Sequence, residues 1–219
     1  MEHPKLISER VVDDIKGRLS KGTFVSIAAA SFSIYAYEAL KEELEQVEQL
    51  RFIFTSPAFI KDKSKKEKRE FFIPKLNRER NLYGTDFELR LRNQLSQKAI
   101  AKECADWIRR KVQFRSNASQ EQMGGFMHVN NETQRVYLPF NEFTTTQLGC
   151  ERGANVYNVV NVLPSPTANA YLEIFNEQWN NDEKFEDVTK RILEYIDIVY
   201  QENAPEYVYF IALYNIFNE

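Results

Sequence analysis

An apolar strand, an amphipathic helix and a second apolar strand follow one another within residues 24–55, and this order most constrains the fold. Two short apolar runs, at 24–27 and 51–55, are typical of buried strands. Between them, apolar side chains recur at helical spacing, namely Ala36, Leu40, Leu44 and Val47. A crossover of this length joins parallel strands. The small residues 28–31 then lie at the carboxyl end of the first strand, where α/β proteins place their sites.

The second half of the chain predicts antiparallel pairing followed by helices. Residues 126–129 and 134–140 flank a short polar turn and indicate a hairpin, and residues 156–160 indicate a further strand. Apolar stripes at 168–179 and 188–199 then predict helices only. We therefore expect an α/β fold with a mixed β-sheet flanked by helices. Residues 1–165 would form the α/β domain, and residues 166–219 an all-helical C-terminal tail that completes it.

Composition excludes several kinds of protein. The 219 residues contain two cysteines, Cys104 and Cys150, and two histidines, which are too few for a Cys/His zinc site. No apolar run approaches the ~20 residues that a membrane span needs. The glycine-rich phosphate fingerprint does not follow the first strand. We expect no metal and no cofactor in this chain, no membrane partner, and a cytoplasmic location.

The formal charge of −3 conceals a basic middle segment. Residues 61–116 carry 17 Lys or Arg and 8 Asp or Glu, a net charge of +9, whereas the remainder carries −12. The densest cations are Lys61, Lys63, Lys65, Lys66, Lys68 and Arg69, and a second group beside Trp107 is Arg109, Arg110 and Lys111. These residues are candidates for binding the phosphates of DNA. Two other interpretations stay open: a solvated lysine loop, and helix-end cations that complement a helix dipole.

One pair of segments, residues 127–130 and 136–144, is a candidate active site. It resembles the second half of a phospholipase D-like phosphodiesterase domain, in which a His-x-Lys strand precedes a turn of Gly-Ser-x-Asn type that continues as Phe-Thr. The resemblance implies that His128 and Asn141 occupy catalytic positions, with Phe143 and Thr144 continuing the turn.

Departures from that pattern predict a degenerate site. In active members the histidine attacks phosphorus and the lysine neutralises phosphoryl oxygens. Here Asn130 stands at the lysine position, Arg135 at the aspartate position, and residues 138–140 replace the small Gly-Ser. Losing one such contact costs about 10²–10³ in rate. Strand alternation places residues 128, 130 and 134 on one face and Arg135 on the other, so Arg135 is not expected to compensate.

A more specific resemblance is to the phospholipase D-like domains at the N-terminus of bacterial superfamily 2 helicases. Residues 104–108 and 202–210 carry it. It implies that the parent protein is an ATP-dependent DNA helicase or a restriction-modification protein, with a motor domain in the same chain as partner. The apolar segment 205–217 ends without a cap, so we expect this chain to be a fragment of a longer protein. A helix that docks fully on its own domain is an interpretation that stays open.

Three functions are compatible with the sequence. The first is a catalytically degenerate module of a helicase that binds DNA or docks a partner. The alternative is an active, metal-independent nuclease or phosphodiesterase that uses His128; because single-motif members build one site from two subunits, it needs a homodimer. The third is a structural interaction domain without nucleic acid. The sequence leaves open whether the chain is an enzyme.

Overall fold

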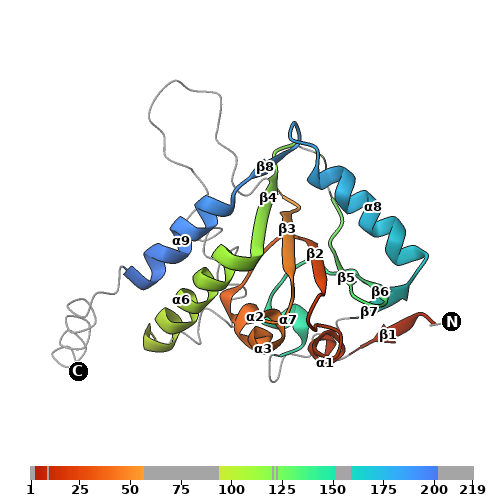
Figure 1. Cartoon of the computed structure of the whole chain (residues 1–219), viewed down its shortest axis with the longest axis horizontal. Helices are drawn as coiled ribbons and strands as arrows, with labels where there is room; N and C mark the ends of the chain where they lie inside the picture. The colour runs from red at the N-terminus through yellow and green to blue at the C-terminus, as the bar shows by residue number, and fades with distance from the viewer. Residues whose placement is uncertain are drawn as a thin grey trace.

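The structure is a computed structural model that describes residues 3–8, 10–56, 94–119, 121, 123–150 and 159–201. Within these residues eight strands form one sheet in the order β1-β7-β6-β5-β2-β3-β4-β8 (Figure 1). The central strands β2, β3 and β4 are parallel, and the other pairings are antiparallel. The strands are β1 (Lys5–Ile7), β2 (Phe24–Ala29), β3 (Gln49–Phe54), β4 (Val112–Asn117), β5 (Phe126–Asn130), β6 (Gln134–Leu138), β7 (Val160–Pro164) and β8 (Phe185–Asp187).

Helices cover both faces of the sheet unequally. Figure 1 shows α8 on the side of the sheet opposite α6 and α9. The larger core, on the α6 and α9 side, includes the aromatic rings of Phe32, Phe52, Phe54 and Phe114, and Ala28, Ile53 and Phe175 belong to the smaller core under α8. The described helices are α1 (Val11–Lys16), α2 (Ile34–Ala39), α3 (Lys41–Leu44), α6 (Gln94–Lys111), α7 (Thr145–Leu148), α8 (Thr167–Trp179) and α9 (Thr189–Gln201).

The mixed sheet flanked by helices confirms the expected fold class, and the first crossover shows why it forms. Val25 of β2 lies beside Leu50 of β3 in parallel register. Helix α2 begins where the Ser33 hydroxyl accepts hydrogen bonds from the backbone of Tyr35 and Ala36, at 3.1 and 3.4 Å. This N-cap satisfies donors that the first helical turn leaves unpaired.

The predicted hairpin is β5 followed by β6. His128 lies opposite Val136, and Asn130 lies opposite Gln134, so residues 128, 130 and 134 share one face of the sheet as predicted. Arg135 lies opposite Val129 on the other face and is buried. Strand alternation therefore separates Arg135 from the face that holds His128.

Two short strands correct the sequence-based prediction. The C-terminal region is not wholly helical, because β8 lies between α8 and α9 and pairs with β4, with Asp187 opposite Arg115. At the other sheet edge β1 pairs with β7, and the sequence did not predict β1 either. Each is three residues long, too short to show a period of two, and each forms only because a neighbouring strand supplies hydrogen-bond partners.

Some predicted features fall outside the described residues. They include the cations at 61–69, the C-terminal segment 202–219 and residues 151–158, which hold most of the strand predicted at 156–160. The described strand β7 begins at Val160, the last residue of that prediction, and runs to Pro164. Among the helices that the structure describes, none combines the length and the apolar character needed to cross a bilayer.

Candidate functional site

The turn that carries Asn141 lies at the carboxyl end of β2. The amide of Ala30 donates a 2.7 Å hydrogen bond to the carbonyl of Asn141, and the amide of Phe143 donates one of 2.9 Å to Ser31. These bonds hold the 140–144 segment against the ends of the parallel strands, the edge where ligands bind in open α/β sheets. The Asn141 side chain is exposed there.

Gly125 brings the start of β5 against the same turn. A Cβ atom at this glycine would lie 2.5 Å from the carbonyl oxygen of Phe140 and 2.6 Å from the Cα of Asn141. The Gly125 carbonyl accepts a 3.0 Å hydrogen bond from the amide of Phe140. Only a residue without a side chain fits this approach, which explains the glycine.

His128 lies inside the sheet rather than at this edge. It is the third residue of β5, opposite Ser26 of β2 and Val136 of β6, and it has no exposed surface. Three strand residues correspond to roughly 10 Å, so His128 is about that far along β5 from Gly125 and the Asn141 turn. The structure therefore does not bring His128 and Asn141 together.

The surroundings of His128 keep its ring neutral. The pKa of His128 is lowered to about 4, chiefly by burial; Gln134 opposes this effect, the charge of Arg51 adds to it, and the Ala168 backbone opposes it. Within the described residues neither ring nitrogen makes a hydrogen bond of ordinary geometry, and the Gln134 side-chain oxygen is also buried without a partner. The catalytic role that the resemblance implies for His128 and Asn141 stays a prediction.

Arg51 is a partly buried cation near His128 that the sequence analysis overlooked. Its guanidinium donates hydrogen bonds to Ser26 Oγ at 3.2 Å and to Asn176 Oδ1 at 2.9 Å. It also lies 5.0 Å from the ring centre of Phe175 and 5.5 Å from that of Trp179. A single arginine in an otherwise apolar strand was the available signal. Because its Nη2 bonds to Ser26 of β2 and to Asn176 of α8, and the guanidinium lies over two rings of α8, Arg51 fixes α8 to the sheet.

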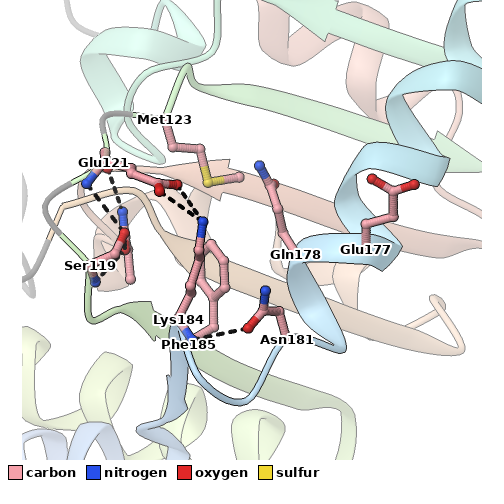
Figure 2. A pocket seen from close by; sticks show the side chains of 9 residues that line it. Ser119, Glu121, Met123, Glu177, Gln178, Asn181, Lys184 and Phe185 are labelled. Carbon is pink, nitrogen blue, oxygen red and sulfur yellow. Dashed lines mark hydrogen bonds and ion pairs between the residues drawn. The ribbon is translucent and has the colours of Figure 1, made fainter.

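A polar pocket opens near the carboxyl end of β4, between the 117–123 segment and the end of α8 (Figure 2). Its volume is about 250 Å³. An ion pair joins its two sides, because Lys184 Nζ lies 2.8 Å from Glu121 Oε1. Only the polarity of residues 117–122 pointed to this region in the sequence. The pocket is lined by Asn117, Ser119, Glu121, Met123, Glu177, Gln178, Asn181, Lys184 and Phe185.

The predicted cations at the end of α6 are engaged within the protein. Arg109 lies 2.8 Å from Asp106 and 2.7 Å from Asp197 of α9. Arg110 lies 2.9 Å from Glu45.

Lys111, the third predicted cation at the end of α6, also has partners within the protein. Its Nζ donates hydrogen bonds to the carbonyls of Glu45 and Val47, at 2.6 and 2.8 Å. Lys111 thus ties the end of α6 to the segment that leads into β3. These contacts favour a structural role for residues 109–111, and the six cations at 61–69 lie outside the described residues.

No cluster of three or more His, Cys, Asp or Glu suited to a metal ion occurs among the residues that the structure describes. Trp107, the aromatic residue beside the cations 109–111, has no exposed surface and donates a 3.1 Å hydrogen bond from Nε1 to the carbonyl of Leu44. It is a core residue.

Comparisons with known proteins add limited information. No protein-family model and no curated protein matches the sequence. Among solved structures, the chain is similar to polyphosphate kinase from Porphyromonas gingivalis, with 10% identity and a TM-score of 0.39 over 88% of this chain and 24% of that chain. It is also similar to phosphatidylserine synthase from Haemophilus influenzae Rd KW20, with 11% identity and a TM-score of 0.42 over 95% of this chain and 45% of that chain. The chain thus spans less than half the length of either protein, and likenesses of this strength transfer no activity.

Proposed function

We propose that this chain is a phospholipase D-like domain that has lost phosphodiesterase chemistry. It binds DNA as one module of a longer protein that also contains a helicase or restriction-type motor domain. The burial of His128 carries the first half of the proposal. A histidine nucleophile must reach a phosphorus atom, and His128 has no exposed surface. At the expected lysine position, Asn130 has no charge to offer a phosphoryl oxygen.

The DNA-binding half rests on the basic segment. Six of the nine residues 61–69 are Lys or Arg, within a region of net charge +9. Because Arg109, Arg110 and Lys111 are occupied by internal partners, we assign the phosphate contacts to residues 61–69 and not to the end of α6.

The test of DNA binding is fluorescence anisotropy with labelled duplex and single-stranded DNA at two salt concentrations. Binding is expected to weaken steeply with salt, because each phosphate contact releases counterions. The double substitution Lys65→Glu and Lys66→Glu is expected to weaken binding at least about tenfold and to reduce the salt slope by about two.

A matched control is Lys102→Glu with Lys190→Glu, which reverses two exposed charges on α6 and α9. This variant is expected to bind within about twofold of the wild type. Equal losses in both double variants would mean that only net charge matters, and would overturn the assignment to residues 61–69. No binding at low salt would exclude DNA and favour docking on the motor domain.

The loss of chemistry is tested separately by incubating DNA with the protein in a metal chelator. No cleavage is expected at any protein concentration. Cleavage that His128→Ala abolishes, and that rises with homodimer formation, would instead establish the alternative nuclease and refute this half of the proposal.

A further inference from the structure

Helix α8 covers its face of the sheet only in part. Side chains on this face form rows across the strands, and His128, Ser26 and Arg51 make the middle row. Helix α8 covers this row, and also the row nearer the carboxyl ends, where Ala28 belongs to the smaller core. The row at the amino ends of β2 and β3 stays open. Phe24 lies in this open row and is 46% exposed, so its ring is available to a ligand.

The neighbours of Phe24 in the open row are uncharged amides. Phe24 lies opposite Gln49 of β3 and Asn130 of β5. Gln49 Nε2 donates a long hydrogen bond of 3.5 Å to Gln113 Oε1 of β4. The Gln49 oxygen and the Gln113 nitrogen then have no hydrogen bond to another described residue. An acceptor and a donor side by side, next to an aromatic ring, match the edge and the face of a nucleobase.

A cleft of about 560 Å³ opens at this row, and Phe24, Gln49 and Gln113 form part of its lining. Its volume lies within the range of small-ligand sites. The charged part of the lining consists of the cations 109–111, which have partners within the protein, and of the exposed acids Glu48 and Asp187. Because charges of both signs are present, the cleft suits an uncharged base better than a phosphate.

Arg51 lies one row further along β3 and is not neutralised by an acid. Its guanidinium bonds to the neutral side chains of Ser26 and Asn176, and no carboxylate among the described residues pairs with it. The positive charge therefore stays uncompensated beside the row of amides. Its field favours the phosphate that accompanies a bound base.

We propose that the open row, made of Phe24, Gln49 and Gln113, binds an unpaired base of single-stranded DNA. The Phe24 ring stacks on the base, and the two amides form hydrogen bonds with its edge. A paired base is stacked on both faces inside the duplex and cannot bind in this way. This inference rests on the proposed DNA binding and adds a preference for single strands at a surface other than residues 61–69.

The test is fluorescence anisotropy of the full chain with three labelled probes, namely an oligothymidylate, an abasic strand of the same length and a duplex. Phe24→Ala is expected to weaken binding of the oligothymidylate about tenfold. Binding of the abasic strand and of the duplex should stay within about twofold. Gln49→Ala combined with Gln113→Ala is expected to weaken binding of the oligothymidylate about threefold.

Leu6→Ala is the matched control, because Leu6 is also a large exposed apolar residue, at 61%, but lies on the edge strand β1. It is expected to change binding of none of the three probes. Lys65→Glu with Lys66→Glu should instead weaken all three, since phosphate contacts do not depend on the bases.

The variant Phe24→Trp keeps an aromatic ring and reports stacking directly. Its fluorescence is expected to be quenched by the oligothymidylate and not by the abasic strand, and its affinity should be at least as high as that of the wild type. The wild type supplies the background signal of Trp107 and Trp179. Retained affinity in Phe24→Trp would show that the loss in Phe24→Ala comes from the missing ring and not from misfolding.

The outcomes separate this inference from the proposed function. Unchanged binding in Phe24→Ala, or equal weakening for the oligothymidylate and the abasic strand, would overturn the inference and leave DNA binding intact. No binding of any of the three probes at low salt would overturn both. Quenching of Phe24→Trp by maltohexaose and not by DNA would also overturn the inference, because the row would then be a carbohydrate site.

Discussion

The guanidinium of Arg51 donates a 2.9 Å hydrogen bond to the side-chain oxygen of Asn176, which joins the centre of the sheet to the helix α8 that covers this face. The same guanidinium bonds to Ser26 and lies over the rings of Phe175 and Trp179. Burial lowers the pKa of Arg51 from its usual value, and these contacts are what offset the cost of burying the charge.

Removal of Arg51 is expected to loosen α8. We predict that Arg51→Ala lowers the free energy of unfolding by about 2–3 kcal/mol, because it removes two hydrogen bonds and the stacking on two rings. Urea unfolding of Arg51→Ala, Asn176→Ala and the double variant measures the coupling between the two residues. We expect a coupling of about 1 kcal/mol, and strictly additive effects would contradict a direct bond.

His128 is expected to make stability depend on pH. Because its pKa is 6.5 in the unfolded chain and about 4 in the folded protein, the unfolded state takes up the proton first as pH falls. Stability is therefore full above about pH 7 and declines between pH 6.5 and pH 4, by roughly 3 kcal/mol in total.

The matched variant is His128→Leu, which keeps the apolar surroundings and removes the titrating ring. Chemical denaturation at a series of pH values should show the difference between wild type and variant growing in favour of the variant as pH falls through this range. At pH 7 we expect the variant to be within about 1 kcal/mol of the wild type, because the ring nitrogens lack partners of ordinary geometry within the described residues. A constant difference across pH would contradict the buried neutral ring.

Two adjacent glycines are expected to respond differently to alanine. At Gly125 a Cβ would clash with backbone atoms of Phe140 and Asn141, whereas at Gly124 it would meet nothing within 4 Å. Gly125→Ala should cost at least about 2 kcal/mol of stability, because backbone cannot move aside cheaply. Gly124→Ala should cost less than about 0.5 kcal/mol, and thermal unfolding of the pair checks both values.

Asp14 is expected to contribute stability that is lost only in strong acid. Burial raises the pKa of its carboxyl, but hydrogen bonds from Lys5, Arg18 and Tyr137 outweigh this effect and hold the pKa below its usual 3.8. Because the folded pKa is the lower one, the contribution is full above about pH 5 and disappears as pH falls through the folded value.

We predict that Asp14→Asn lowers the free energy of unfolding by about 1–3 kcal/mol at pH 7. The difference from wild type should shrink as pH falls below 3.8 and through the lower folded pKa, which separates it from the His128 effect at pH 4 to 6.5. Asp13→Asn, in the exposed pair with Arg10, is the control and should have a much smaller effect. A loss that does not shrink at all as pH falls below 3.8 would mean that packing, not charge, is responsible.

The sequence by itself determined the elements whose apolar pattern extends over several residues. The parallel pair β2 and β3 was indicated by two short apolar runs. The hairpin β5 and β6 and the helices α8 and α9 instead repeat an apolar side chain every two or every three to four positions, which fixes the face that is buried. The shared face of His128, Asn130 and Gln134 was predictable for the same reason, since side chains alternate along a strand.

Only the tertiary structure decided what depends on neighbours distant in sequence. Strands β1 and β8 exist because β7 and β4 supply their hydrogen bonds. His128 is buried because neighbouring strands and α8 cover it. Arg51 bonds to Asn176 of α8, and Arg109 pairs with Asp197 of α9, so both depend on helices that are distant in the sequence.

The pocket at Gln178 is a further case, because α8 meets the 117–123 segment there only after the sheet has formed. Whether a side chain is buried, and whether its charge is paired, depends on the residues that the fold places around it. A pattern along the chain states which residue is present, but not which partner neutralises it.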